Sequence, residues 1–397
     1  MSRLVRSLFL LALAAISVRA DDSPNGWEGS IKPEHVRPHI EFLADPKLAG
    51  RSGANSAKAA DYLIQRFREC KLRPLFPDAS FEQPIPTSAE EPGDANSSVS
   101  SSPRIVGRNV GAFLEGSDPK LRDELIVIGV HFDHLGVRNG AVYRGADDNA
   151  SGTSMMLEVA RRLATAKQRP KRSIVFVGFD LEEQLLWGSR WFVAHPPFEL
   201  SQVKLFITAD MIGRSLGDLP LPTVFVMGSE HAPRLKTLLD EVGAPRGLEV
   251  ARLGVDLIGV RSDYGPFWGE KIPFLFFSTG EHPDYHTPRD VPEKLDFDKV
   301  ARVSSLVLKL VEATANGKTT PEWLDEVAPD LDEVRAVQRI TDLLLQAGEK
   351  KPLTDLQRLI VTQAHNKCQQ ILDRGTFNAD DRKWLIRISQ LLLLSVF

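Results

Sequence analysis

The sequence of 397 residues predicts an α/β protein with a largely parallel β-sheet, followed by an all-helical C-terminal segment. From Gly107 to about Ala315, short runs of β-branched and aromatic residues alternate with amphipathic stretches, a pattern typical of strands connected by helices. From residue 320 onward the apolar periodicity is helical, and no strand pattern returns. These observations predict a sheet-containing part and a helical appendage.

The elements follow in order along the chain. Apolar residues at helical spacing predict helices over 33–45 and 56–72, and a stretch poor in apolar residues predicts a mobile loop over 88–104. The predicted strands are 125–131, 173–179, 204–210, 223–228 and 273–278. The predicted helices between and after them are 152–166, 183–194, 232–242 and 297–316. At least three further helices are expected after residue 320.

The first twenty residues have the pattern of a secretory signal peptide. Arg3 and Arg6 precede an apolar run from Leu8 to Ile16, which is too short to span a bilayer. We therefore expect cleavage near Ala20 and a secreted or periplasmic protein. No other segment approaches eighteen uninterrupted apolar residues, so no integral membrane segment is expected.

Composition excludes some functions and leaves other questions open. The formal net charge is −4 and no basic stripe is present, which argues against a nucleic-acid-binding surface. The two cysteines, Cys70 and Cys368, are too few for a disulfide framework in a chain of this length, and the sequence does not decide whether they are bonded. It does not reveal the oligomeric state either.

Metal-type side chains stand at or just after the ends of the predicted strands and in the loops between them. They are His131, Asp148, Glu182, Glu183, Asp210 and His286. Ligands bind outside the carboxyl ends of the strands in an open α/β sheet, so these side chains are expected to converge. Histidine nitrogens and carboxylate oxygens are ligands that zinc accepts. The sequence therefore predicts a metal site.

Each of these residues taken singly is weak support. A lone histidine at a strand end is usually structural, and an adjacent pair of glutamates is usually a solvated helix N-terminus. Their joint occurrence in order favours the site. In an extended chain Asp133 shares a face with His131 and could fix its tautomer. Five ligands are too many for one tetrahedral zinc, but they suit two zinc ions that share one carboxylate.

The ordered runs HFDHLG, GADDNASG, FDLEEQ, ADMIGR, RSD and HPDYHTPRD resemble the M28 family of zinc peptidases, in particular its aminopeptidase group. The resemblance covers roughly residues 35–315. It implies a zinc-exopeptidase-like three-layer fold with a mixed, mostly parallel eight-stranded sheet between helices. The expected organisation is a signal peptide at 1–20, a catalytic domain at 21–318 and a helical extension at 319–397.

The resemblance also implies a role for each site residue. One Zn²⁺ would bind His131, Asp148 and Asp210, and a second would bind Asp148, Glu183 and His286. Glu182 would be the general base, and Asp133 would support catalysis beside it. A non-proline cis peptide is expected between Asp148 and Asn149. Tyr264 stands where relatives carry histidine, and it is expected either to donate to the oxyanion of the substrate or only to pack against Phe267 and Trp268.

The implied function is that of an exported aminopeptidase with two Zn²⁺ per chain, which acts on peptides with a free N-terminus. Three alternatives stay open: a carboxypeptidase or dipeptidase of the same fold, a glutaminyl-cyclase-like enzyme, and a non-catalytic interaction module. Metal content separates them, since two zinc ions indicate the hydrolase, one the cyclase and none the module.

Overall fold

The computed structural model describes residue 27 and residues 31–87, 104–347 and 353–395. The predicted signal peptide and, apart from Arg104, the predicted mobile loop lie outside the described residues. In spatial order the main strands are β1 (Arg73–Pro74), β3 (Ile105–Leu114), β7 (Ser173–Phe179), β4 (Leu125–His131), β8 (Val203–Ala209), β11 (Phe274–Ser278), β9 (Thr223–Met227) and β10 (Glu249–Arg252). A further strand, β2 (Glu82–Pro86), also pairs with β3.

The centre of this mixed sheet is parallel. β7, β4, β8 and β11 pair in parallel, whereas β3 and β9 are antiparallel to their inner neighbours. The expected three-layer α/β fold is therefore confirmed, with the eight-strand order extended by β2. The five strands predicted from the sequence agree with the observed ones to within one residue at each end.

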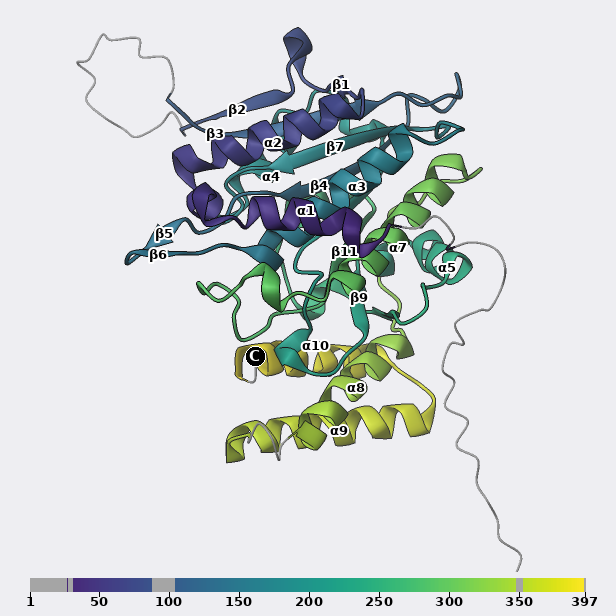
Figure 1. The fold of residues 1–397 in the computed structure, drawn as a ribbon. Helices are drawn as coiled ribbons and strands as arrows, with labels where there is room; N and C mark the ends of the chain where they lie inside the picture. Colours follow the sequence, from purple (N-terminus) through teal and green to yellow (C-terminus); the bar gives the residue numbers. More distant parts are fainter. Residues whose placement is uncertain (1–26, 28–30, 88–103, 348–352, 396–397) are drawn as a thin grey trace, which may run out of the picture.

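Helices cover both faces of the sheet (Figure 1). One face packs against α1 (Pro33–Leu43), α2 (Ser56–Glu69), α3 (Gly152–Ala164), α5 (Pro233–Val242) and α7 (Phe297–Asn316). The other packs against α4 (Trp187–Ala194), α6 (Tyr264–Gly269), α8 (Leu331–Ala347) and α10 (Ala379–Ser395), and α9 (Asp355–Arg374) packs on α8 and α10. Strand alternation separates the two cores: Ile126 and Ile128 of β4 face the first, and Leu125 and Val127 face the second.

One predicted helix begins later than expected. The sequence predicts a helix from residue 183, but α4 begins at Trp187. Leu181, Leu185 and Leu186 have positive φ angles of 61°, 62° and 60°, which are incompatible with a right-handed helix. The two glutamates therefore lie in an irregular loop rather than in a first helical turn.

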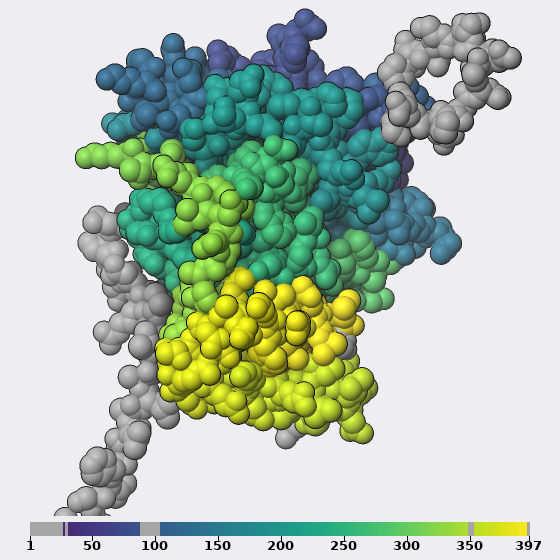
Figure 2. Space-filling model, turned by 180° about the vertical axis from the view of Figure 1, so that it is seen from behind, coloured from purple at the N-terminus to yellow at the C-terminus, as the bar shows by residue number. Residues whose placement is uncertain are grey.

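The C-terminal helices cover the β9–β10 end of the sheet. The helices predicted after residue 320 are confirmed as α8, α9 and α10, and Figure 2 shows this segment as a block against the sheet-containing part. Their apolar residues share one core with β9. Arg382 of α10 donates to both carboxylate oxygens of Asp256 at 2.6 and 2.8 Å, and to Glu333 of α8 at 3.1 Å. The appendage is thus fixed by packing and by a buried ionic cluster.

The two cysteines lie in different cores and are not bonded to each other. Cys70 packs against the first core and Cys368 lies in the second, and both thiols are free. The sheet therefore separates them.

None of the described helices combines the length and apolarity that crossing a bilayer requires.

Candidate metal centre

Three parallel strands bring predicted ligands to one edge of the sheet. β7, β4 and β8 are neighbours with the same direction, so their carboxyl ends lie together. His131 is the last residue of β4, and Asp210 directly follows β8. Glu182 and Glu183 follow β7 after a two-residue turn. The convergence predicted from the strand ends is therefore present in the structure.

The first group of converging side chains consists of His131, Glu182 and Asp210, whose ligand atoms lie within 4.8 Å of one another. His131 is fully buried, and its Nε2 lies 3.4 Å from Oδ2 of Asp210. Both ring nitrogens of His131 and Oδ1 of Asp210 are buried without a hydrogen-bond partner. Buried polar atoms are rarely left without partners, so this group is suited to binding a cation.

The second group contains Asp148, Glu183 and two histidines. Nε2 of His286 lies 3.2 Å from Oδ2 of Asp148 and 3.1 Å from Oε2 of Glu183. Nδ1 of His134 lies 2.7 Å from Oε1 of Glu183. The sequence analysis assigned His286 to this set but did not assign His134. The available signal was its place three residues after His131 in HFDHLG.

Asp148 lies between the two groups. Its Oδ1 is 3.4 Å from Nε2 of His131, and its Oδ2 is 3.2 Å from Nε2 of His286. It is buried within the irregular helical turn η4 (Ala146–Ser151), and the peptide bond between Asp148 and Asn149 is cis, as predicted. One carboxylate therefore presents a different oxygen to each histidine.

Asp133 makes other contacts than the one expected. Its Oδ1 is 3.6 Å from Nδ1 of His131, too far for the predicted hydrogen bond. Instead, its carboxylate accepts the backbone N–H groups of Glu182 at 3.1 Å and Glu183 at 3.4 Å. Asp133 thus ties the loop after β7 to the end of β4 and fixes the backbone of both glutamates.

The hydroxyl of Tyr264, which was a candidate oxyanion donor, forms hydrogen bonds with a nearby loop. Its phenol is fully buried, donates to the carbonyl of Gly259 and accepts the N–H of Arg261 at 3.0 Å. Its ring stacks on Phe274, with centroids 5.2 Å apart. The phenol proton is already used by a loop carbonyl, which argues against the oxyanion role, one of the two roles expected for Tyr264. Tyr264 does pack among aromatic rings, although Phe274 takes the place of the partners expected.

A buried carboxylate that the sequence analysis did not assign supports the bridging residue. Both oxygens of Asp290 accept the N–H of Asp147, at 2.9 and 3.1 Å, and Oδ2 also accepts the N–H of Asp148 at 3.1 Å. Asp290 stands in the HPDYHTPRD run, four residues after His286. The sequence therefore shows that Asp290 is near His286 in the chain, but it does not show the contact of Asp290 with η4.

Arg51 organises the same region from the N-terminal part of the chain. Its guanidinium is fully buried and donates only to main-chain carbonyls. Those carbonyls belong to Leu43, Phe132, Arg144, Gly145 and Asp148. Burial lowers the pKa of Arg51 to about 10, so the group stays charged at neutral pH. No motif in the sequence marks this residue, because its partners are backbone groups from distant segments.

The two adjacent glutamates have opposite pKa shifts. Burial, reinforced by the nearby negative charge of Asp263, raises the pKa of Glu182 well above its ordinary value. Burial also acts to raise the pKa of Glu183, but interactions with His134 and His286 outweigh it and lower that pKa. Pairs of carboxylates with opposed shifts are typical of sites that divide proton transfer from charge stabilisation.

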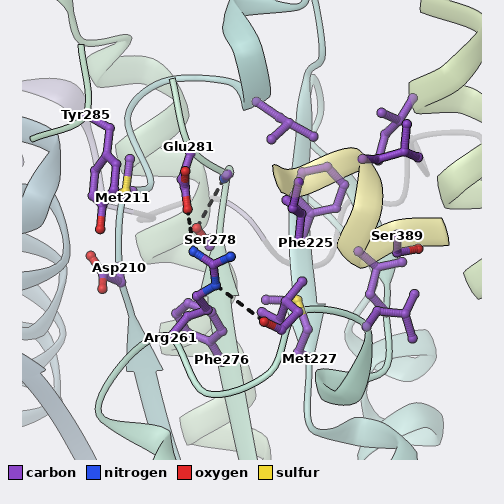
Figure 3. A pocket seen from close by; sticks show the side chains of 18 of the residues that line it. Asp210, Met211, Phe225, Met227, Arg261, Phe276, Ser278, Glu281, Tyr285 and Ser389 are labelled. Atoms are coloured by element: carbon purple, nitrogen blue, oxygen red, sulfur yellow. Dashed lines mark hydrogen bonds and ion pairs between the residues drawn. The ribbon is translucent and has the colours of Figure 1, made fainter. Parts of the chain in front are cut away.

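A pocket opens from this centre. It has a volume of about 140 Å³ and reaches from Asp148, Glu182 and Asp210 to residues of α8 and α10. Tyr285 lines the end of the pocket near Asp210 (Figure 3). Its ring stacks on that of His286, with centroids 3.8 Å apart. Burial and the surrounding carboxylates raise the pKa of Tyr285.

Solved structures with the same fold include enzymes of more than one activity. BSAP, a zinc aminopeptidase from Bacillus subtilis, matches with a TM-score of 0.54 and 17% identity over 75% of this chain and 99% of its own. The glutaminyl cyclase of Porphyromonas gingivalis matches with a TM-score of 0.55 and 20% identity over 71% of this chain and 98% of its own. At these identities the similarity shows the fold.

Sequence comparison identifies the family. The chain is 27% identical over 211 residues to the aminopeptidase YwaD of Bacillus subtilis, a match that covers 51% of this chain and 43% of YwaD. The chain therefore spans less than half the length of this relative. The profile of peptidase family M28 matches residues 109–311, which contain every residue of both histidine–carboxylate groups. This chain belongs to peptidase family M28.

Proposed function

We propose that this M28 peptidase is an exported dinuclear zinc aminopeptidase, which removes N-terminal residues from peptides. The position of Asp148 carries the proposal, because its two oxygens face His131 and His286 separately. A shared carboxylate between two histidine-containing groups is the arrangement that two zinc ions with one bridging ligand require.

The proposed ligand sets follow from these contacts. His131, Asp148 and Asp210 would hold one Zn²⁺, and Asp148, Glu183 and His286 would hold the other. The donor set fits zinc, since it consists of imidazole nitrogens and carboxylate oxygens, several of them buried without hydrogen-bond partners. His134 contacts Glu183 and would either orient that carboxylate or add a ligand.

The proposed mechanism assigns proton transfer to Glu182. Zinc ions held by these ligands would lower the pKa of the nucleophilic water and polarise the scissile carbonyl. Glu182 takes the proton of the water and then delivers it to the leaving amine. Asp133 supports this step by holding the Glu182 backbone in place.

The side chains of the pocket offer little to a substrate carboxylate. Four carboxylates line it, from Asp148, Glu182, Asp210 and Glu281. Arg261 is the only cation among the described lining residues, and its Nη1 donates to Glu281 at 2.8 Å. Apart from the proposed zinc ions, a substrate carboxylate would therefore find no unpaired cation among the described lining residues. This argues for an aminopeptidase over a carboxypeptidase.

A glutaminyl-cyclase-like activity is the second candidate, since that fold matches with a similar TM-score. Both candidates are tested on the purified full-length protein, with zinc measured by mass spectrometry. The substrates are aminoacyl reporters, their N-acetylated forms and a peptide with N-terminal glutamine, each with and without a chelator.

Two zinc ions per chain and chelator-sensitive hydrolysis of only the free-amino reporters are expected. Cyclisation of the glutamine peptide with one bound zinc would support the cyclase. Hydrolysis of N-acetylated substrates at their carboxyl end would support a carboxypeptidase, and a protein without zinc or activity would support an interaction module.

The proposal also covers the export of the protein and the division of the chain into segments. We propose that residues 1–20 are removed on export, that residues 21–318 form the catalytic domain and that residues 319–397 form a helical extension. Mass determination of the N-terminus after expression in an exporting host tests the first point. A mature chain that still begins with Met1 would contradict it.

A further inference from the structure

The helices of the appendage line the same pocket as the metal centre. Val337 and Ile340 of α8 and Leu392 of α10 form one part of its wall, and Asp210 and Glu182 form another. Figure 3 shows Asp210 and Tyr285 at one end and Ser389 of α10 at the other, with Phe225 between them. Residues outside the stretch matched by the family profile, 109–311, therefore shape a space that begins at the proposed reaction centre.

Strand periodicity explains why the wall is apolar. Phe225 and Met227 are two residues apart on β9 and point to the same face, toward α8 and α10. Phe276 on β11 has the same orientation. The charged lining residues belong to the sheet-containing part, and the lining residues of α8 and α10 carry no charge. A substrate group that reaches this wall would have to be uncharged.

The wall is held in a fixed position. Arg382 on α10 joins Asp256 and Glu333, and it is only 10% exposed. Gln390 on the same helix donates to the carbonyl of Asp256 at 3.2 Å. The segment around Asp256 also contributes Leu253 and Leu257 to the pocket. The ionic cluster and this hydrogen bond therefore fix α10 relative to the segment that carries Leu253 and Leu257.

The size of the pocket indicates what it accepts. Its volume of about 140 Å³ resembles that of engineered apolar cavities of ~150 Å³, which bind benzene. A phenylalanine, leucine or methionine side chain fits within this space, whereas alanine would leave most of it empty. Burial of such a side chain favours it over alanine by about 10- to 100-fold.

We infer that α8 and α10 form the far wall of the pocket for the N-terminal side chain, so that the appendage selects substrates with a large apolar first residue. The inference rests on the proposed aminopeptidase function. It assigns a specificity-determining role to Val337, Ile340 and Leu392, which lie outside the catalytic machinery.

The experiment that tests this inference uses a substitution in the appendage that makes the pocket smaller. Leu392→Phe adds volume at the wall, and Leu394→Phe is the matched control, because Leu394 lies on the same helix and is 83% exposed. The measured quantity is kcat/KM for reporters with N-terminal Ala, Leu and Phe. We expect Leu392→Phe to lower the Phe-to-Ala and Leu-to-Ala ratios at least tenfold, whereas Leu394→Phe leaves them unchanged.

A second variant, Ile340→Ala, enlarges the pocket by removing side-chain volume from its wall. It is expected to raise kcat/KM for a reporter with N-terminal Trp relative to one with N-terminal Leu by several-fold. Thermal unfolding of each variant confirms that it is folded at the assay temperature. Unchanged ratios in both folded variants would overturn the inference while leaving the aminopeptidase function intact.

Binding of the free amino acids, which are the proposed reaction products, tests the pocket without hydrolysis. Calorimetry is expected to show that phenylalanine binds the zinc-loaded wild type more tightly than alanine does, and that Leu392→Phe removes the difference. If no free-amino reporter is hydrolysed, the proposed function fails, and this measurement still decides the role of the wall. Equal binding of phenylalanine and alanine by the wild type would overturn the inference about the wall.

Discussion

Glu182 and Glu183 are neighbours in the chain, but their carboxylates face different histidines. Glu182 lies in the group of His131 and Asp210, whereas Oε2 of Glu183 is 3.1 Å from Nε2 of His286. The irregular loop after β7 makes this possible, because Asp133 binds both backbone N–H groups and the side chains diverge from there. The arrangement predicts separable roles.

Glu182→Gln should therefore keep both zinc ions and lose turnover. The amide preserves size and polarity but cannot accept the proton of the water, so kcat is expected to fall by roughly 10²–10⁴-fold with little change in KM. Zinc content by mass spectrometry and steady-state kinetics measure the two effects.

Glu183→Ala is the paired variant and should lower zinc content, since it removes a carboxylate that contacts two histidines. Loss of metal from Glu182→Gln together with retention in Glu183→Ala would reverse the two assignments. Full activity of Glu182→Gln with two zinc ions would exclude the general-base role.

Tyr285→Phe is expected to reduce kcat. The Tyr285 hydroxyl is a hydrogen-bond donor at the end of the pocket near Asp210, and loss of one oxyanion donor typically costs about 10²–10³-fold. Steady-state kinetics on one aminoacyl reporter provide the measurement. A kcat within twofold of the wild type would show that the hydroxyl does not contact the reacting carbonyl.

Tyr264→Phe should instead affect stability. Among the described residues, its hydroxyl bonds only to backbone groups of the loop at 259–261. The free energy of unfolding is therefore expected to fall by about 1–3 kcal/mol while kcat stays constant. Urea unfolding and the same kinetic assay give the two readouts. A selective loss of kcat would restore the oxyanion role to this residue.

Glu158 on α3 predicts an acid-dependent stability. Burial acts to raise its pKa, but hydrogen bonds with His39 and Arg161 lower it from 4.5 to about 2. Because the folded-state pKa lies below the unfolded value, the stabilisation is complete above about pH 4.5 and is lost as the pH falls toward 2. The full contribution is about 3 kcal/mol, of which about 2 kcal/mol disappears between pH 7 and pH 3.

Glu158→Gln isolates this contribution. The difference in unfolding free energy between wild type and variant is expected to shrink by about 2 kcal/mol from pH 7 to pH 3. Urea titrations at both values measure it. A difference that does not change with pH would show that the carboxylate charge of Glu158 contributes no stability.

Arg382→Met should weaken the attachment of the appendage. It leaves Glu333, only 3% exposed, and Asp256 without their cation, and removal of one partner from a buried pair costs about 3–5 kcal/mol. The control Arg335→Met breaks an exposed ion pair with Asp332 on α8 and should cost at most about 1 kcal/mol. Equal losses in urea unfolding would contradict the structural role of Arg382.

Much of the fold was predictable because its signals are local. The strands at 125–131 and 173–179 are short runs of β-branched and aromatic residues buried on both faces, and the structure has them at the predicted residues. β10 was not predicted, since its four residues, Glu249–Arg252, are exposed or half-buried and show no apolar run. The helix expected over 183–194 begins only at Trp187, because tertiary contacts of the preceding loop override helical propensity.

The sequence by itself determined the family, the α/β class and the residue types of the metal centre. Residues such as His131 and Asp210 stand at strand ends, and a parallel sheet necessarily brings its strand ends together. The tertiary structure decided what depends on contacts between distant segments. It placed His134 beside Glu183, turned the Tyr264 hydroxyl toward a loop carbonyl and set α10 against the pocket. Side-chain direction and the packing of one segment on another arise from the whole core, and no local pattern encodes them.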